Sequence, residues 1–136
     1  MTYYVDANYW IYWFDKRFPE HKHVTKIMRK AIHEGIVLNT ITIIEIAHYF
    51  RYMPKQDFKE RIEKILGLST LTLAELNLEI LKTALDILAE NANTGIGGRD
   101  SVILATMKNK NIKKILTHDK TFKKIREIEV IDTIPS

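Results

Sequence analysis

The sequence predicts an α/β fold in which helices cover both faces of a central parallel sheet of about four to five strands. Short apolar or β-prone runs alternate with amphipathic helical patterns along the 136 residues. The run 36–38 is apolar throughout, as is typical of a strand that is buried on both faces. Strands that alternate with helices in this way form parallel sheets in a three-layer α/β/α arrangement. The length predicts a single domain, residues 1–136.

Proline and glycine mark the ends of the helices in the first half of the chain. Pro19 and Pro54 lack the amide hydrogen that a helix interior needs. Gly35 and Gly67 suit the residue that follows a helix end. Between them, apolar residues recur at helical spacing, and two short runs are β-prone. The elements expected here are strands at 2–5 and 36–38 and helices at 8–14, 20–34, 41–52 and 55–66.

The second half of the chain continues the same alternation. A flexible, glycine-rich segment at 93–98 separates its two long helices. This segment is not a dinucleotide-binding fingerprint, because no strand precedes it. The elements expected here are strands at 68–73, 113–117 and 127–131, helices at 74–92 and 100–107, and a helical turn at 121–124.

The composition is that of a globular protein and limits its chemistry. Hydrophobic residues make up 46% of the chain and charged residues 28%. No stretch approaches the roughly 20 apolar residues of a membrane span. Asp6 interrupts the only early apolar run, so no signal peptide is expected and we predict a cytoplasmic protein. The absence of cysteine excludes disulfides and thiolate metal sites.

Positive charge is concentrated in the last third of the chain. There are 21 Lys and Arg residues against 17 Asp and Glu residues, a net charge of +4. A basic rim around an acidic pocket would suit a polyanion that is bound by its phosphates. The alternative is a solvated, lysine-rich helix face, and the charge pattern alone does not decide between them. The residues concerned are Lys108, Lys110, Lys113, Lys114, Lys120, Lys123, Lys124 and Arg126.

Four acidic residues lie in apolar segments, where solvated charges are not expected. They are Asp6, Glu45, Asp100 and Asp119. Asp6 and Asp119 end strands, and Glu45 lies one helical turn beyond the end of another. Active sites of open α/β sheets lie at the carboxyl ends of strands. The four side chains are therefore candidates to converge at that edge.

Some of these acids also have a purely structural interpretation. Thr42 and Glu45 are three residues apart near a helix start, which is the spacing of a capping box. The same helix is expected to begin with Asn39 or Thr40 as its cap. Asp100 could stabilise the macrodipole in the first turn of its helix, a contribution of about 0.3 to 1 kcal/mol.

The expected helix at 8–14 is dominated by aromatic and apolar residues. These side chains could belong to the core or to a dimer contact, or they could stack on nucleic-acid bases. We favour the core or a dimer contact. Platforms that stack single-stranded bases more typically lie on exposed sheet faces.

Converging carboxylates would need protons or cations. Two ionised carboxylates about 5 Å apart repel by roughly 3 kcal/mol at an effective dielectric constant of 20. Carboxylate oxygens without His or Cys select hard ions, Mg²⁺ or Mn²⁺ rather than Zn²⁺. Such ions activate water and stabilise the charge of a displacement at phosphorus. The residues therefore predict metal-dependent phosphodiester hydrolysis, and the chain has no P-loop or G-x-S-x-G elbow.

The acids lie in four segments, Val5-Asp6-Ala7-Asn8, Thr42-Ile43-Ile44-Glu45, Asp100-Ser101-Val102-Ile103-Leu104-Ala105 and Leu116-Thr117-His118-Asp119-Lys120-Thr121-Phe122. Each segment is a weak motif alone. In this order and at this chain length they resemble the PIN-domain nucleases, particularly the small VapC-type toxins. The resemblance covers essentially the whole chain, and it implies a PIN-like fold with an acidic metal-binding cluster.

The resemblance also implies a substrate, partners and residue roles. Three acids would hold Mg²⁺ or Mn²⁺, and Glu45 would be a further ligand or would position the attacking water. The substrate would be RNA, the chain would form a homodimer, and a small antitoxin protein would inhibit it. The residues implied are the metal ligands Asp6, Asp100 and Asp119 and the supporting polar residues Asn8, Thr42 and Thr117. The positive charge of the last third, and not the resemblance, leads us to expect Lys120, Lys123, Lys124 and Arg99 as RNA-binding residues.

Two positions depart from the family pattern. Thr121 stands where many relatives carry an additional acid, so the resemblance does not extend to a second metal ion. Arg99 is uncommon beside Asp100, and it could lower the charge of the cluster or reach a phosphate. Two other functions remain open at this point. They are a PIN nuclease of RNA maturation without an antitoxin, and a nucleic-acid-binding or assembly module that does not cleave.

Overall fold

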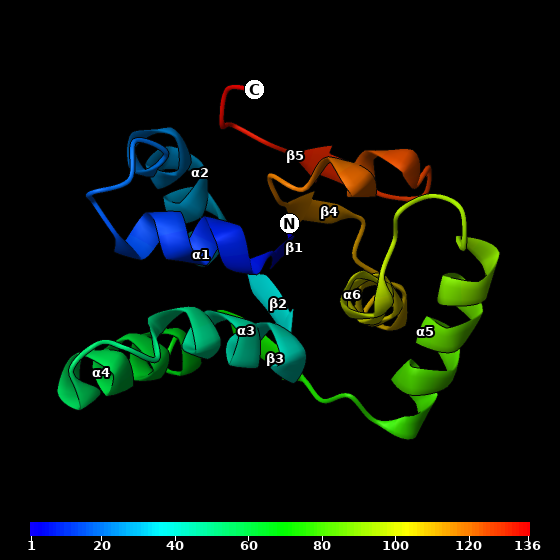
Figure 1. Ribbon diagram of the computed structural model, residues 1–136, viewed down its shortest axis with the longest axis horizontal. Coiled ribbons are helices and arrows are strands. Elements are labelled where there is room, and N and C mark those ends of the chain that lie inside the picture. The colour runs from blue at the N-terminus through cyan, green and yellow to red at the C-terminus, as the bar shows by residue number, and fades with distance from the viewer.

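Five parallel strands form the centre of the molecule, which is described over residues 1–136 by a computed structural model (Figure 1). The strands are β1 (Tyr3–Val5), β2 (Ile36–Asn39), β3 (Leu71–Ala74), β4 (Lys114–Leu116) and β5 (Glu129–Ile131). Their order in the sheet is β3-β2-β1-β4-β5, and every neighbouring pair is parallel. The predicted parallel sheet is confirmed.

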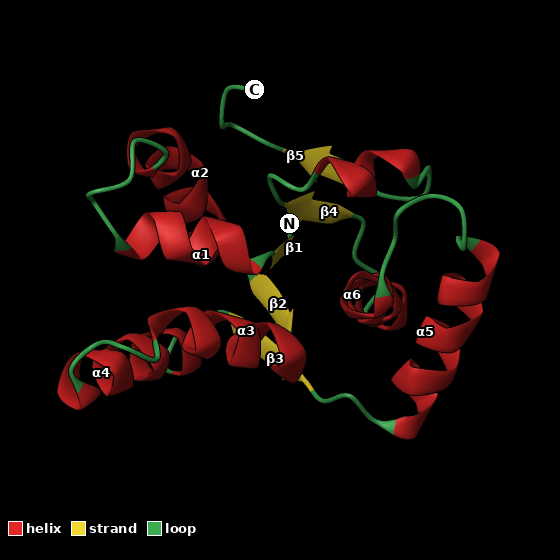
Figure 2. Cartoon of the chain, in the orientation of Figure 1, coloured by secondary structure: helices red, strands yellow, loops and turns green.

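Helices lie on both faces of this sheet (Figure 2). They are α1 (Ala7–Phe14), α2 (His21–Glu34), α3 (Thr40–Phe50), α4 (Lys55–Leu66), α5 (Leu78–Glu90), α6 (Gly98–Asn109) and the 3₁₀ turn η1 (Lys120–Lys124). The chain runs from β1 outward to β3 and then returns past β1 to β4 and β5. Because parallel crossovers are right-handed, α1 to α4 cover one face and α5 and α6 the other (Figure 1). None of the helices is both long and apolar enough to span a bilayer.

The central strand β1 is buried and carries a polar connection to β2 and α3. The hydroxyl of Tyr4 lies 2.6 Å from the hydroxyl of Thr42 and accepts a hydrogen bond from the backbone amide of Asn39 at 3.0 Å. Burial raises the pKa of Tyr4, so the hydroxyl stays protonated. The buried tyrosine therefore fixes the end of β2 and the start of α3 against β1.

The largest difference from the sequence prediction lies between β3 and α5. The sequence predicts a strand at 68–73 and a helix from Ala74, but Ala74 belongs to β3 and α5 begins only at Leu78. Ala74 continues the sheet because it pairs with Asn39 of β2. The side chain of Asn77 then caps α5 by accepting a hydrogen bond from a backbone amide of its first turn at 2.9 Å. Alanine is the best helix former, but local propensity is a weak determinant of structure and tertiary strand pairing overrides it.

The other elements begin and end within two residues of their expected positions. The aromatic side chains of α1 also meet the expectation that they belong to the core. Tyr9 and Trp10 are fully buried, and Trp10 Nε1 donates a hydrogen bond to the carbonyl oxygen of Val5 at 3.1 Å. The remaining aromatic residues of α1 are partly buried and pack against the same core.

We predict that Tyr4→Phe destabilises the fold. The change removes the acceptor of the Asn39 amide and the partner of the Thr42 hydroxyl, and an unsatisfied buried polar group costs about 1–3 kcal/mol. Urea unfolding followed by circular dichroism measures the loss. In the control variant Tyr52→Phe the side chain is 85% exposed, so the free energy of unfolding should change by less than about 0.5 kcal/mol. Equal losses in the two variants would contradict the prediction.

Candidate active site

The four predicted acids meet at the carboxyl edge of the sheet, beside β1 and β4. Asp6 follows β1 directly, and Asp119 lies three residues beyond the end of β4. These strands are neighbours, but the chain leaves them toward opposite faces of the sheet (Figure 1). Such a switch point opens a crevice at the strand ends, which is where open α/β sheets bind ligands.

Asp6 is held by both of its carboxylate oxygens and is only 1% exposed. Oδ1 accepts a hydrogen bond from the backbone amide of Ala7 at 2.8 Å and so caps α1. Oδ2 accepts a hydrogen bond from the hydroxyl of Thr117 at 2.7 Å. The backbone amide of Asp6 donates to the carbonyl oxygen of Leu116 at 2.9 Å. The strands β1 and β4 therefore fix this carboxylate in place.

Glu45 reaches the same crevice from α3. Asn39 caps this helix, because its side chain accepts a hydrogen bond from the backbone amide of Ile41 at 3.0 Å. Thr42 therefore lies inside the first turn and is fully buried. The capping-box interpretation of Thr42 and Glu45 is wrong, since Asn39 takes the cap position. Instead, Oε1 of Glu45 lies 3.0 Å from Nη1 of Arg99.

Asp100 and Asp119 each stabilise a helix start and also face the crevice. Oδ2 of Asp100 accepts a hydrogen bond from the backbone amide of Gly97 at 3.4 Å. Oδ1 of Asp119 accepts hydrogen bonds from the backbone amide and the hydroxyl of Thr121, at 3.0 and 2.8 Å. The helix-start interpretation of Asp100 is thus compatible with its place in the cluster. Thr121 orients Asp119 through these two hydrogen bonds.

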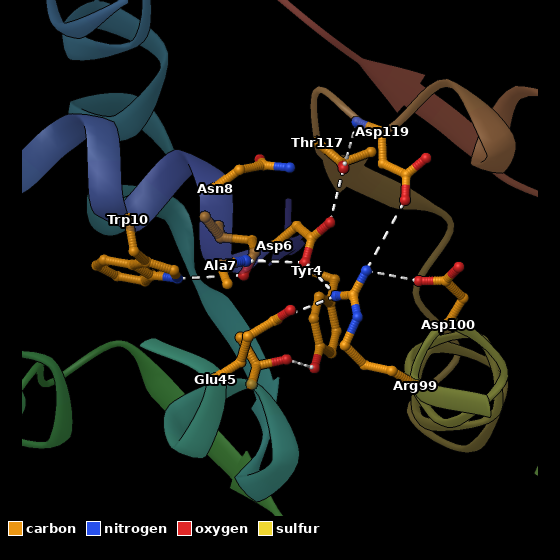
Figure 3. Close-up of polar contacts among 12 residues, drawn as sticks. Tyr4, Asp6, Ala7, Asn8, Trp10, Glu45, Arg99, Asp100, Thr117 and Asp119 are labelled. Carbon is orange, nitrogen blue, oxygen red and sulfur yellow. Dashed lines mark hydrogen bonds and ion pairs between the residues drawn. The ribbon is translucent and has the colours of Figure 1, made fainter. Parts of the chain in front are cut away.

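Arg99 lies at the centre of the four carboxylates (Figure 3). Its Nη1 is 3.0 Å from Oδ1 of Asp6 and 3.0 Å from Oε1 of Glu45. Its Nη2 is 2.7 Å from Oδ1 of Asp100 and 3.8 Å from Oδ2 of Asp119. In this arrangement no three His, Asp or Glu side chains form a group that could hold a metal ion. We call the four acids the acidic cluster.

One guanidinium does not offset the negative charge of the acidic cluster. Burial raises the pKa of Glu45; Arg99 opposes this effect, while Asp6 and Asp100 add to it. Burial likewise raises the pKa of Asp100 against the influence of Arg99. For Arg99, burial favours the neutral form, but the surrounding carboxylates outweigh it and raise its pKa. The cluster can therefore accept further positive charge.

The three expected supporting residues differ in how directly they touch the acids. Thr117 is fully buried, donates to Asp6, and accepts a hydrogen bond from the backbone amide of Asp119 at 3.0 Å. It ties two acids together. Asn8 accepts a hydrogen bond from the backbone that follows Thr117, at 3.4 Å. Thr42 is bonded to a buried tyrosine of β1 and not to an acid.

Sequence reasoning missed a polar network next to Asp119. Nδ1 of His118 lies 2.7 Å from Oδ2 of Asp132, and the hydroxyl of Tyr9 donates to Oδ1 of Asp132 at 2.7 Å. Burial alone would raise the pKa of Asp132, but the hydrogen bonds from Tyr9 and His118 lower it. The one available signal was the position of Asp132 directly after β5, at the same edge of the sheet.

The structure does not gather the basic residues of the last third into one rim, and Lys124 and Arg126 border a hollow together with Lys108 and Lys113. One group belongs to η1, which Asp119 caps, and consists of Lys120, Lys123 and Lys124. The other lies where α6 ends and β4 begins, and consists of Lys108, Lys110, Lys113 and Lys114. Several members of this second group border a hollow together with Met1 and Thr2, which precede β1. The second group therefore lies at the edge opposite the acidic cluster and does not form a rim around it.

A hollow of about 440 Å³ opens beside the acidic cluster. Asp6, Glu45 and Arg99 form part of its wall. Basic, aromatic and polar side chains form other parts, among them Arg51 and Tyr52. Asp6 and Glu45 therefore face a space that is large enough for part of a substrate and that basic side chains also border.

The chain matches the PIN domain family over residues 3–128. This span contains the whole acidic cluster and Arg99. The chain therefore belongs to the PIN domain family, and the resemblance inferred from the sequence is confirmed.

Similar proteins of known name agree with this assignment. Ribonuclease VapC6 from Methanocaldococcus jannaschii is 32% identical over 76 residues, 56% of this chain and 48% of that protein. The chain thus spans about half the length of this curated relative. VapBC2 from Rickettsia felis, solved bound to a DNA fragment from its promoter, is 16% identical with a TM-score of 0.75 over 97% of this chain and 98% of that chain. VapC20 from Mycobacterium tuberculosis, a toxin that cleaves the sarcin-ricin loop, is 11% identical with a TM-score of 0.77 over 90% and 94%. At these identities the two structures establish the shared fold alone.

We predict that Thr117→Val destabilises the protein. Valine has a similar shape but cannot donate to Asp6 or accept from the amide of Asp119, and leaving buried groups unpaired costs about 1–3 kcal/mol. Urea unfolding measures the change. Thr25→Val is the matched control, because the Thr25 hydroxyl only bonds a carbonyl oxygen of its own helix and is half-buried. We expect a clearly smaller loss there, and equal losses would show that Thr117 does not support the acids.

Proposed function

We propose that the protein is a metal-dependent endoribonuclease that hydrolyses RNA phosphodiester bonds. The observation that carries this proposal is the acidic cluster at the switch point of the sheet, which surrounds a cation and retains an excess of negative charge. Membership of the PIN domain family and similarity to a ribonuclease support RNA as the substrate.

The donor chemistry of the acidic cluster fits Mg²⁺ or Mn²⁺. All of its ligating atoms would be carboxylate oxygens, which hard divalent cations prefer. We propose that Asp6, Asp100 and Asp119 hold the ion and that Glu45 is a further ligand or positions the attacking water. When bound, such an ion would lower the pKa of water and stabilise negative charge on the phosphate.

The protein's own side chains would orient the reacting groups. Thr117 and Thr121 hold Asp6 and Asp119, each through one oxygen. Glu45 uses Oε1 toward Arg99, so its Oε2 can accept the proton of an attacking water.

Basic residues near the acidic cluster would hold the RNA. Lys120, Lys123 and Lys124 are exposed on η1, and Arg99 borders the hollow beside the acids. Electrostatic contacts of this kind bind phosphates without regard to sequence and weaken with salt. They would place an RNA strand across the carboxyl edge of the sheet.

We extend the proposal to a toxin that acts in the cytoplasm and is inhibited by a small antitoxin. The similarity to VapC20, a toxin, supports this extension. We also propose a homodimer. Leu78, Leu81 and Leu85 of α5 recur at helical spacing and are 64%, 39% and 55% exposed, which gives a second copy an apolar surface to cover.

We predict that a mixed RNA pool is cut in Mg²⁺ or Mn²⁺ but not with chelator, and that Asp6→Asn lowers the rate. Asparagine still caps α1 but does not carry the charge. The loss should be roughly 100-fold or more, since even the outer partners of metal ligands contribute 10–100-fold. Asp86→Asn, at an exposed position on α5, is the control and should cut like wild type. If the protein binds RNA but cuts none under any condition, a module that binds without cleaving is the better account. The central position of Arg99 among the acids would then explain the lack of cleavage.

We predict that replacing Lys120, Lys123 and Lys124 together by alanine weakens RNA binding and reduces its salt dependence. Each lost phosphate contact should reduce the slope of log affinity against log salt by about 0.7 for single strands. Fluorescence anisotropy in a salt series measures both quantities. The matched control removes Lys110, Lys113 and Lys114 at the opposite edge of the sheet, with the same loss of net charge. If the two triple variants behave alike, η1 is not the RNA contact.

A further inference from the structure

The guanidinium of Arg99 uses one oxygen of every member of the acidic cluster (Figure 3). In three of the four acids the other oxygen already has a partner in the protein. Oδ2 of Asp6 is bonded to Thr117, and Oδ1 of Asp119 is bonded to Thr121. Oδ2 of Asp100 accepts from the backbone amide of Gly97. Another cation at the same place would therefore meet the oxygens that now face Arg99.

The guanidinium also sets the spacing of the acids. With Arg99 between them, no three carboxylates are close enough together to hold a metal ion. A divalent ion needs its carboxylate oxygens at about 2.0–2.6 Å, much closer than the guanidinium contacts. The guanidinium and a metal ion therefore cannot share the centre of the acidic cluster.

Arg99 has room to leave that centre. It is the second residue of α6, and its side chain is 32% exposed. It borders the hollow of about 440 Å³ beside the acids. The guanidinium can thus turn toward this hollow, whose wall Arg99 already helps to form.

We propose that Arg99 and a divalent metal ion occupy the acidic cluster in exchange, so that Arg99 is an internal cation that the metal ion must displace. This inference rests on the proposed metal-dependent function and concerns how the same site is loaded. The metal-free protein keeps its acids paired with Arg99. Metal binding turns Arg99 into the hollow, where its guanidinium is free to contact a phosphate of the RNA.

The test compares Mn²⁺ binding to the RNA-free protein by isothermal titration calorimetry in wild type and Arg99→Met. Methionine keeps an unbranched side chain but not the charge. We expect the variant to bind Mn²⁺ about tenfold more tightly, a size usual for coupled binding events. Arg29→Met is the control, since Arg29 is exposed on α2 and its loss changes the net charge equally. It should bind Mn²⁺ like wild type.

A second measurement is made on the wild-type protein, in case Arg99→Met does not fold. The side-chain Nε–H signal of Arg99 is followed by nuclear magnetic resonance during a Mg²⁺ titration, with Arg99→Lys to assign it. We expect this signal to shift in step with metal binding, while other arginine signals stay in place. A signal that is unchanged at saturating Mg²⁺ overturns the proposal.

The outcomes separate this inference from the proposed function. Equal or weaker Mn²⁺ binding by Arg99→Met overturns the exchange but leaves the nuclease proposal intact. If Arg29→Met and Arg99→Met both bind Mn²⁺ more tightly than wild type, the cause is the lower net charge. That result also overturns the exchange. Absence of Mn²⁺ and Mg²⁺ binding in every variant overturns the metal assignment and the exchange together.

Discussion

The ion pairs between Arg99 and the acidic cluster are the interaction on which the carboxyl edge of the sheet depends. Two ionised carboxylates about 5 Å apart repel by roughly 3 kcal/mol at an effective dielectric constant of 20, so buried acids cannot gather here without positive charge. Arg99 comes from α6 on one face of the sheet, while Glu45 comes from α3 on the other. The same contacts that reduce the repulsion therefore join the two helical layers across the crevice.

The structural and chemical uses of the acids are not alternatives. Three of the acids accept a hydrogen bond from a backbone amide at a helix start, namely Asp6, Asp100 and Asp119. Each also presents an oxygen to Arg99 at the centre of the cluster. The cap orients the carboxylate, and the orientation makes a site for a cation. An acid at a helix start in an apolar segment therefore indicates both roles when several such starts meet at one edge of a parallel sheet.

Position at strand ends predicted the acids well, whereas proximity along the chain predicted the lysines poorly. Asp6 and Asp119 end neighbouring parallel strands, so the direction of the strands brings them to one edge. Lys113 and Lys114 are close to Asp119 in sequence, but they lie at the start of β4 and Asp119 follows its end. The two lysines are therefore at the opposite edge of the sheet from Asp119. The start of α5 was misplaced for a different reason. Ala74 favours a helix locally, and only its pairing with Asn39 makes it part of a strand.

The sequence by itself determined the alternation of strands and helices, the family, and the four acids, because these depend on local apolar patterns, caps and short motifs. The tertiary structure alone decided what Arg99 does. Arg99 and Asp6 are 93 residues apart, and no local pattern specifies that one guanidinium meets four carboxylates from separate elements. That meeting depends on the order of strands in the sheet and on which face each crossover takes, since these determine which charges share a buried crevice.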